Sequence, residues 1–420
     1  MTLESGLRGN IPLTRLTVLT VTDGGSWTVL RINIIHMGFL YSGGGERVVI
    51  EQAKGLKERG HLVKVYSPVI RWNKCFPNEL AEIQPSRIVP PLQFSVRDRT
   101  ITLPFPFREA SAMLASVIFP FRLRELADCD ILLCHSEPSM AIGYRIAKLH
   151  GIPYVGYLHQ CTSFIHERPT LAGNWAGTDF AAFSLLGKFR TFIKPMDRLA
   201  HAEAARLLFN SEWTRKRFGQ EYGLSGDVCY PAIDTIGMNV RETRHDELIT
   251  ACRHYAWKRI DLAIDVLAQL PTNVTLEISS ERTPLTSMLE KQASALGIID
   301  RVKFTGFIEN EKLYRDFASS RVYLQPSVEE PFGLSTLEAQ SFGTPAVAWG
   351  DAGGNETILN GETGYVVTPY DFQEYTSRVR SLVDDEASWN AMSRNAKIWA
   401  TTFSWEDHLN ILEGVLDAER

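Results

Sequence analysis

The feature that most restricts the fold of this 420-residue chain is an alternation of apolar strand-length runs with helix-length segments. Residues 31–39 form an apolar run, and a glycine turn at residues 43–45 separates it from a segment with helical spacing. A second apolar run at residues 61–66 follows Gly60 and completes a strand–helix–strand unit. Because parallel strands need such crossovers, the pattern predicts a doubly wound α/β domain with a parallel sheet.

The alternation then continues through both halves of the chain. Further strands are expected at residues 130–135, 152–159, 206–209, 227–230, 248–252, 274–279, 302–305, 322–325 and 344–348. A length of 420 residues is enough for two or three domains at about 150 residues each. We therefore divide the chain into an extension (1–30), an N-terminal Rossmann-like domain (31–235), a second Rossmann-like domain (236–395) and a C-terminal helix (396–420) that packs back toward the first domain.

Composition excludes several classes of protein. Hydrophobic residues make up 44% and charged residues 22%, which is typical of a globular chain rather than a disordered or fibrous one. A net charge of −5 argues against a nucleic-acid partner. The charge is uneven along the chain. Residues up to Asp234 include 27 basic and 21 acidic ones, and the rest of the chain includes 17 basic and 28 acidic ones. The basic half is the one expected to meet an anionic surface or ligand.

The cysteine pattern and the apolar runs bear on location. The six cysteines are scattered without a C-x-x-C pair, which argues against a zinc site or a disulfide framework. No apolar run reaches the ~18–20 residues of a membrane span, and the start of the chain lacks the pattern of a signal peptide. We expect a cytoplasmic protein, with contact to the cytoplasmic face of the membrane left open.

The strongest local pattern is the segment EPFGLSTLE at residues 330–338. Its first carboxylate, Glu330, is expected at the carboxyl end of a strand, and Glu338 about one turn into the following helix. The free N–H groups at the start of that helix suit a phosphate. Taken alone, the spacing also fits two surface acids that flank a turn.

The order of motifs along the chain resembles the group 1 glycosyltransferases (glycosyltransferase family 4), in particular mannosyltransferases that elongate lipid-linked oligosaccharides. The resemblance covers roughly residues 31–395 and rests on GGGER (43–47), NSEWT (210–214), YPAID (230–234), EPFGLSTLE (330–338) with Ala339, FGTP (342–345), GGNE (353–356) and GETGYVV (361–367). It implies the α/β GT-B fold, in which two doubly wound Rossmann-like domains face each other across a cleft.

The resemblance assigns roles to the two glutamates of this motif. Glu330 would contact hydroxyls of the donor sugar and Glu338 the ribose, since one carboxylate can accept hydrogen bonds from two hydroxyl groups. The backbone N–H groups of Phe332, Gly333 and Leu334 would lie on the phosphate side.

Arg253 and Lys258 match the Arg-x4-Lys pair of the family. A fixed guanidinium and ammonium stabilise the negative charge that develops on a departing nucleoside diphosphate. Without the resemblance, the two are solvated cations at a strand end. Two departures from the family pattern are Cys252, where glycine is usual, and residues 279–281, where a turn with glycine is common.

Three further positions follow from the resemblance. Gly43 and Gly44 would lie beside the phosphate and sugar of the donor, where a side chain would block approach; the turn has neither a G-x-G-x-x-G nor a Walker pattern, and a simple tight turn is the alternative. His159 would lie near the reacting carbon, with a structural histidine as the alternative. Phe307 and Ile308 complete the donor-binding set.

No metal or other cofactor is expected. Asp128 and Asp130 imitate the D-x-D pair that holds a metal in the other large glycosyltransferase fold, but they precede a strand instead of following one. No group of carboxylates and histidines has metal-ligand spacing. Cationic side chains and helix ends would carry the diphosphate in the implied fold.

Two stretches mix apolar and basic residues and suit a lipid headgroup interface. They are residues 110–126, with Arg122 and Arg124, and residues 183–198, whose cations are Lys188, Arg190, Lys194 and Arg198. Ordinary amphipathic helices on a core are the alternative. The peripheral contact would therefore involve the N-terminal half.

These observations lead to one functional hypothesis and two rivals. The hypothesis is a retaining, metal-independent hexosyltransferase that moves a hexose, with mannose as first choice, from a nucleotide-diphosphate sugar to a hydroxyl of a lipid-linked or saccharide acceptor; retention comes from the resemblance. The first rival is a soluble sugar-phosphate or polysaccharide synthase of the same fold. The second, a non-catalytic scaffold, is disfavoured because the charged site residues are intact.

Overall fold

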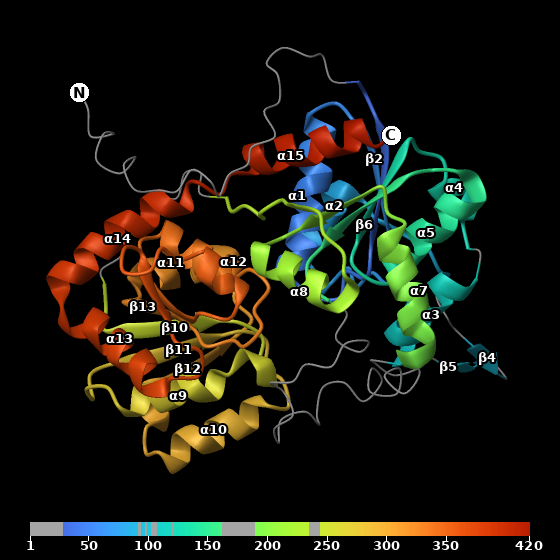
Figure 1. The fold of residues 1–420 in the computed structure, drawn as a ribbon. Helices are drawn as coiled ribbons and strands as arrows, with labels where there is room; N and C mark the ends of the chain where they lie inside the picture. Colours follow the sequence, from blue (N-terminus) through green and yellow to red (C-terminus); the bar gives the residue numbers. More distant parts are fainter. Residues whose placement is uncertain are drawn as a thin grey trace, which may run out of the picture.

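The computed structural model describes residues 28–90, 94–96, 99–101, 107–119, 121–161, 190–234 and 244–420. Figure 1 shows two α/β halves, each built around its own sheet with helices on both faces. The expected extension at residues 1–30 lies almost wholly outside the described residues, as do residues 183–189 of the second basic stretch.

The first half is built around a seven-stranded parallel sheet in the order β3-β2-β1-β6-β7-β8-β9. Its strands are β1 (Arg31–His36), β2 (Leu62–Ser67), β3 (Ser86–Arg87), β6 (Ile131–His135), β7 (Tyr154–Leu158), β8 (Arg206–Phe209) and β9 (Asp227–Val228). All five residues of β6 and of β7 are buried. Helices on both faces of a sheet cause such continuous burial, which is why these strands appear as apolar runs rather than alternating patterns.

The helices of the first half are α1 (Gly44–Glu58), α2 (Pro77–Ile83), α3 (Phe107–Ile118), α4 (Leu123–Leu126), α5 (Ser139–His150), α7 (Arg190–Ala202) and α8 (Glu212–Tyr222). A small antiparallel hairpin of β4 (Phe94–Val96) and β5 (Arg99–Ile101) lies apart from the main sheet. Ser211 caps the start of helix α8, and its Oγ accepts a hydrogen bond from the backbone N–H of Thr214 at 3.0 Å. Such a side-chain cap satisfies an N–H group that the helix leaves free.

The second half is built around a six-stranded parallel sheet in the order β12-β11-β10-β13-β14-β15. Its strands are β10 (Glu247–Ala251), β11 (Thr275–Ser279), β12 (Val302–Gly306), β13 (Val322–Gln325), β14 (Ala346–Trp349) and β15 (Gly364–Val367). Its helices are η3 (Ala256–Lys258), α9 (Ile260–Ala268), α10 (Thr286–Ala295), η4 (Ile299–Arg301), α11 (Asn310–Ser319), α12 (Leu334–Ser341), η5 (Gly353–Glu356), α13 (Phe372–Asp384) and α14 (Glu386–Ala400).

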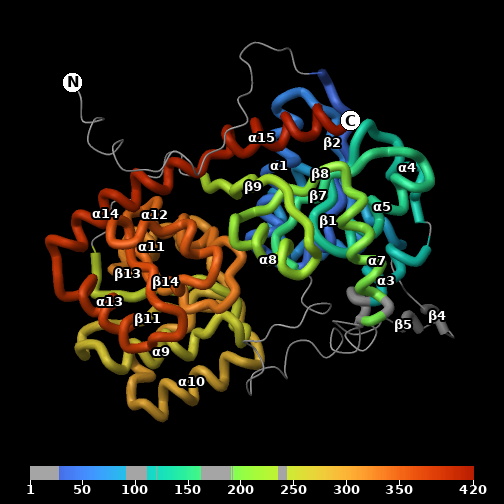
Figure 2. Tube along the Cα trace, viewed as in Figure 1, coloured from blue at the N-terminus to red at the C-terminus, as the bar shows by residue number. Residues whose placement is uncertain are grey.

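The last helix, α15 (Trp405–Ala418), leaves the second half and packs on α1 of the first (Figure 2). Leu409 and Leu412 join the apolar core of the first half. A side chain on Gly55 of α1 would collide with Leu409, because an added Cβ would lie 2.3 Å from its Cδ1. On the same face, Glu413 contacts Arg59 at 2.6 Å and His61 at 2.7 Å. The C-terminal helix therefore ties the two halves together.

The predicted fold class is confirmed: both halves are doubly wound, and every expected strand overlaps a strand of the structure. The sequence analysis missed the short strand β3, the hairpin and the edge strand β15. In each sheet the strand order reverses direction at one point, between β1 and β6 in the first and between β10 and β13 in the second. Ligands of open α/β sheets bind beyond the carboxyl ends of the strands at that point.

Candidate active site

Two of the predicted charged residues meet at the switch point of the second sheet. Lys258 follows β10, and Glu330 follows β13. The Lys258 Nζ lies 2.5 Å from Glu330 Oε2, and their side chains are only 17% and 12% exposed. Partial burial strengthens such a pair and fixes both groups at the carboxyl edge of the sheet.

Arg253, also after β10, is held by aromatic rings from both halves. Its guanidinium carbon lies 3.6 Å from the ring centroid of Tyr41 and 4.8 Å from that of Tyr255. A cation over an aromatic face is stabilised by the charge distribution of the ring. Nearby, burial raises the pKa of Glu46 to about 7, although the charge of Arg253 opposes this rise. Neither Tyr41 nor Glu46 has a role predicted from sequence.

Glu338, on α12, forms an ion pair with Arg47 from the glycine-turn motif. Arg47 also donates a hydrogen bond to Asn310 Oδ1 at 3.5 Å. Next to this pair is a small pocket of about 50 Å³ whose lining includes Arg47, Asp234, Asn310 and Tyr314. Arg47 belongs to the GGGER motif but has no function predicted from sequence, because nothing in the spacing indicates a partner in the other half.

The glycine turn lies between the two halves. A Cβ added to Gly44 would lie 2.9 Å from Cδ1 of Leu334, the first residue of α12. A Cβ added to Gly45 would lie 3.9 Å from the ring of His159. At Gly43 an added Cβ would meet Glu46 Oε2 at 2.6 Å. The turn therefore brings the start of α12 and His159 to one place, and side chains at Gly43 and Gly44 would disturb it.

Histidines gather at the carboxyl edge of the first sheet. The Nε2 of His159, just after β7, lies 3.1 Å from Nδ1 of His135, the last residue of β6. His36, the last residue of β1, has its ring centroid 6.1 Å from that of His135. Burial lowers the pKa of His159 to about 4, and burial together with His159 lowers that of His36 to about 3. These imidazoles are therefore neutral at pH 7.

The other predicted donor-binding residues differ in exposure. Gly333 has a φ of +97°, a left-handed conformation that glycine adopts without strain, and it caps α12. The ring of Phe332 is buried and packs between Tyr230 (centroids 5.7 Å apart) and Phe403 (5.9 Å). Only its backbone therefore remains for a ligand. Phe307 is 63% exposed on the loop after β12, and Ile308 beside it is half-buried.

Three of the quoted motifs hold the halves together rather than facing the charged pairs. The Glu356 carboxylate accepts hydrogen bonds from the backbone N–H of Glu212 (2.9 Å) and Trp213 (2.7 Å) and from the hydroxyl of Tyr230 (2.8 Å). Ser211 Oγ donates to the carbonyl of Pro331 at 2.5 Å, directly after Glu330. These bonds join the start of α8 to η5 and to the loop that carries Glu330.

The D-x-D imitation lies elsewhere. Asp128 and Asp130 precede β6 and contact Arg31 at 3.0 and 2.7 Å. Because Arg31 begins β1, this cluster lies at the amino edge of the sheet, opposite to the histidines. The two carboxylates already have a cationic partner on the surface, as expected for residues outside a donor site.

Two family models match the chain. The model described as Glycosyltransferase Family 4 matches residues 42–236, and the model described as Glycosyl transferases group 1 matches residues 239–399. Together they account for most of both halves. The chain belongs to the group 1 glycosyltransferases.

Several relatives are similar in sequence to parts of this group 1 glycosyltransferase. D-inositol 3-phosphate glycosyltransferase from Streptomyces avermitilis is 36% identical over 28% of this chain and 25% of its own length. A GDP-mannose-dependent alpha-(1-6)-phosphatidylinositol monomannoside mannosyltransferase from Mycolicibacterium smegmatis is 30% identical over 47% of the chain and 58% of its own length. The chain thus spans about a quarter to just over half of these relatives.

A crystal structure of Anabaena Alr3699/HepE in complex with UDP and glucose is similar to this group 1 glycosyltransferase over 93% of the chain and 100% of its own. The TM-score is 0.71 and the identity 20%. At that identity the likeness shows the fold alone, which is the GT-B arrangement of two Rossmann-like domains.

Proposed function

We propose that this protein is a retaining glycosyltransferase that transfers a hexose from a nucleotide-diphosphate sugar to a hydroxyl group. The observation that carries the proposal is the meeting of Lys258 with Glu330, beside Arg253, at the switch point of the second sheet. Fixed cations at a strand edge suit a diphosphate, and a carboxylate next to them suits sugar hydroxyls.

In this proposal the bound donor replaces the partners that these charged residues have in the free protein. The diphosphate takes Lys258 and Arg253, while the released Glu330 accepts hydroxyls of the sugar. Glu338 separates from Arg47 and accepts hydrogen bonds from the ribose. The first N–H groups of α12 face the phosphates. Lys258 and Glu330 therefore each keep a partner in the free and the bound state, and Arg47 keeps its hydrogen bond to Asn310.

The chemical step builds negative charge on the diphosphate as its bond to the anomeric carbon breaks. Arg253 and Lys258, already fixed before the reaction, stabilise that charge without reorganising. The acceptor hydroxyl forms its new bond on the face from which the phosphate departs, and its proton passes to a phosphate oxygen. His159 is neutral and adds no charge that would compete at the reacting carbon. Metal independence is part of this proposal, because cationic side chains take the place of a metal.

Mannose from GDP-mannose is the proposed donor sugar. Its support is the GGGER form of the first loop and the similarity to a GDP-mannose-dependent mannosyltransferase. The test is hydrolysis of GDP-, UDP- and ADP-sugars by the full chain, with Glu330→Gln as the inactive reference. Release of mannose from GDP-mannose supports the proposal. Preference for a UDP- or ADP-sugar would instead favour the soluble synthase, and no hydrolysis or transfer with any donor would favour the scaffold.

The proposed acceptor is a lipid-linked molecule, which the protein would reach through its first half. The helices α3 and α7, which both contact α5, carry exposed apolar side chains. They are Leu114 and Ile118 on α3, Phe119 directly after it, and Met196 and Leu199 on α7. Lys194 and Arg198 are exposed on the same helix α7. Apolar and basic groups together suit a headgroup interface at the cytoplasmic face of a membrane.

The described helices set a limit on how such a contact can form. None of them combines the length and the apolar character that crossing a bilayer requires. The proposed contact is therefore made by exposed side chains of these helices. The saccharide acceptor of a soluble synthase would not need it.

A further inference from the structure

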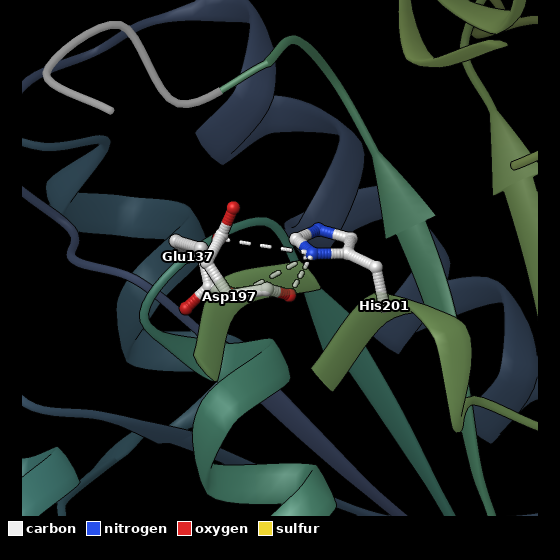
Figure 3. A group of neighbouring side chains, drawn as sticks. All are labelled: Glu137, Asp197 and His201. Atoms are coloured by element: carbon white, nitrogen blue, oxygen red, sulfur yellow. Dashed lines mark hydrogen bonds and ion pairs between the residues drawn. The ribbon is translucent and has the colours of Figure 1, made fainter. Parts of the chain in front are cut away.

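Three titratable side chains meet in the first half, outside the proposed donor site. Figure 3 shows Glu137 from the loop after β6 together with Asp197 and His201 from α7. His201 Nδ1 lies 3.7 Å from Asp197 Oδ1 and 3.9 Å from Glu137 Oε1. One ligand atom from each residue lies within 4.8 Å of the others. The side chains are 9%, 2% and 1% exposed in chain order.

The arrangement leaves one oxygen without a partner. Glu137 Oε1 is buried, faces His201 and has no hydrogen-bond partner among the described residues. Leaving a buried carboxylate oxygen unpaired is costly. Two carboxylates and an imidazole in so small a volume call for a cation between them.

We propose that Glu137, Asp197 and His201 bind one divalent transition-metal ion, with Zn²⁺ as the best fit. Imidazole and carboxylate together are a ligand set that Zn²⁺ accepts. In a tetrahedral site with metal–ligand bonds of 2.0–2.2 Å, neighbouring ligand atoms lie about 3.4 Å apart. The separations of 3.7 and 3.9 Å from His201 Nδ1 therefore need to shrink by only a few tenths of an ångström, and the carboxylate oxygens of Glu137 and Asp197 lie within 4.8 Å of each other.

The surroundings match those of a metal ligand. The hydroxyl of Tyr222 donates to Asp197 Oδ2 at 2.6 Å, which leaves Oδ1 directed at the imidazole. Such hydrogen bonds orient ligating carboxylates in metal sites. The rings of Phe218 and Tyr222 lie 5.4 and 5.0 Å from that of His201 and give the site an apolar wall.

A hydrogen bond of His201 competes with the metal. His201 Nδ1 lies 2.8 Å from the backbone oxygen of Asp197, four residues earlier on the same helix, and donates a proton to it when no metal is bound. Metal binding moves that proton to the other ring nitrogen. The carbonyl keeps the backbone N–H of residue 201 as its helical partner, so it is not left unsatisfied.

The ion would join two elements that the sequence separates by sixty residues. It would fix the loop after β6 to α7, next to the histidines at the edge of the first sheet. Its role is to organise this half, and it would not touch the diphosphate. The proposal departs, at these three residues, from the expectation that no group of carboxylates and histidines has metal-ligand spacing.

The test measures metal content rather than activity, so it is independent of the proposed function. The full chain is stripped with EDTA, dialysed, given one equivalent of Zn²⁺ and passed through gel filtration before elemental analysis. Glu137→Gln and His201→Gln remove one ligand each. Glu203→Gln is the matched control, since Glu203 lies just beyond α7 and its exposed carboxylate contacts Lys148 at 2.9 Å on the surface.

The proposal expects one zinc per chain in the wild type and in Glu203→Gln, and at least a tenfold weaker affinity in the two ligand variants. Zinc in excess of its Kd should raise the wild-type Tm by on the order of 5 °C. A wild-type chain that retains no zinc overturns the proposal, and this outcome does not depend on whether the variants fold. Zinc retained equally by Glu137→Gln and His201→Gln overturns it as well, because the ion would then be bound elsewhere.

Discussion

The two edges that meet at the candidate active site have opposite electrostatic character. The edge of the first sheet presents imidazoles that burial keeps neutral, at His36, His135 and His159. The edge of the second sheet presents charges that are already paired, in Lys258 with Glu330 and in Arg253 between two rings. A diphosphate needs fixed cations, whereas the reacting carbon is best served by surroundings without a competing charge. The difference supports the proposed function, in which the donor binds to the second half and the acceptor to the first.

Removing a cation from the second edge should have the largest effect. We expect Arg253→Ala and Lys258→Ala each to lower turnover about a hundredfold, since a fixed charge contact contributes ~3 kcal/mol to the barrier. Thermal unfolding should change little by comparison. Arg259→Gln is the control, because Arg259 is in the same loop but contacts Asp261 at 2.9 Å. Near-normal turnover in either alanine variant would show that this edge does not bind the diphosphate.

The second prediction tests whether the difference in net charge between the two halves decides which half binds a membrane. Anionic vesicles should be bound through the basic first half, with ~1 kcal/mol from each cation near the surface. Changing both Lys194 and Arg198 to Ser should weaken binding about thirtyfold at low salt. Added salt should weaken binding of the wild type, because it screens exposed charges.

The control for that experiment is a pair of cations in the acidic half. Lys312 and Arg315 are exposed on α11, and changing both to Ser should leave vesicle binding unchanged. Sedimentation with vesicles measures both variants. A wild-type protein that ignores anionic vesicles even at low salt would remove the support for a lipid-linked acceptor and favour the soluble synthase.

Much of the site was predictable because parallel sheets align the ends of their strands. Lys258 and Glu330 are seventy-two residues apart, yet each follows a strand that borders the switch point, so fold class and motif position together bring them to one edge. His135 and His36 were missed, although the first of them ends an expected strand at the same edge as His159. Their spacing carries no chemical signal.

Contacts between the halves were not predictable in the same way. The ion pair of Arg47 with Glu338 and the stacking of Arg253 on Tyr41 depend on how the two domains pack. Periodicity defines each sheet separately and says nothing of that packing. The cluster around Asp197 and His201 shows the same limit: the two are four residues apart on one helix, but Glu137 joins them only through the fold.

The third prediction tests whether the buried histidines of the first edge, and His408 of α15 packed near them against Tyr157, are neutral in the folded protein. A histidine whose pKa falls from 6.5 to about 4 on folding binds fewer protons than in the unfolded chain. Stability should therefore be unaffected above pH 6.5 and decline between pH 6.5 and 4, by up to about 1.4 kcal/mol per pH unit for each such residue. Buried acids such as Glu46, whose pKa is raised, act in the opposite direction over part of this range.

A single variant separates these contributions. His408 of α15 has a pKa lowered to about 4 by burial, and its Nδ1 lies 2.7 Å from the carbonyl of Tyr230. In His408→Gln the amide keeps that hydrogen bond without titrating. Urea unfolding at a series of pH values should show a slope between pH 6.5 and 4 that is smaller than the wild-type slope by about 1.4 kcal/mol per unit. Equal slopes would mean that this imidazole is charged in the fold.

The smallest expected effect is that of a chelator on turnover, and it tests the division between the edges most directly. In the proposed function Arg253 and Lys258 of the second edge neutralise the diphosphate, so donor hydrolysis at a temperature well below the Tm should stay within about twofold after EDTA treatment. The proposed zinc ion belongs to the first half, where its loss should lower the Tm instead. If EDTA abolishes hydrolysis, the metal that restores it identifies the site. Rescue by Mg²⁺ or Mn²⁺ in both wild type and Glu137→Gln would place a metal on the diphosphate and refute the metal-free donor site. Rescue by Zn²⁺ that requires Glu137 would mean instead that the first edge, through the loop after β6, controls the chemistry at the second.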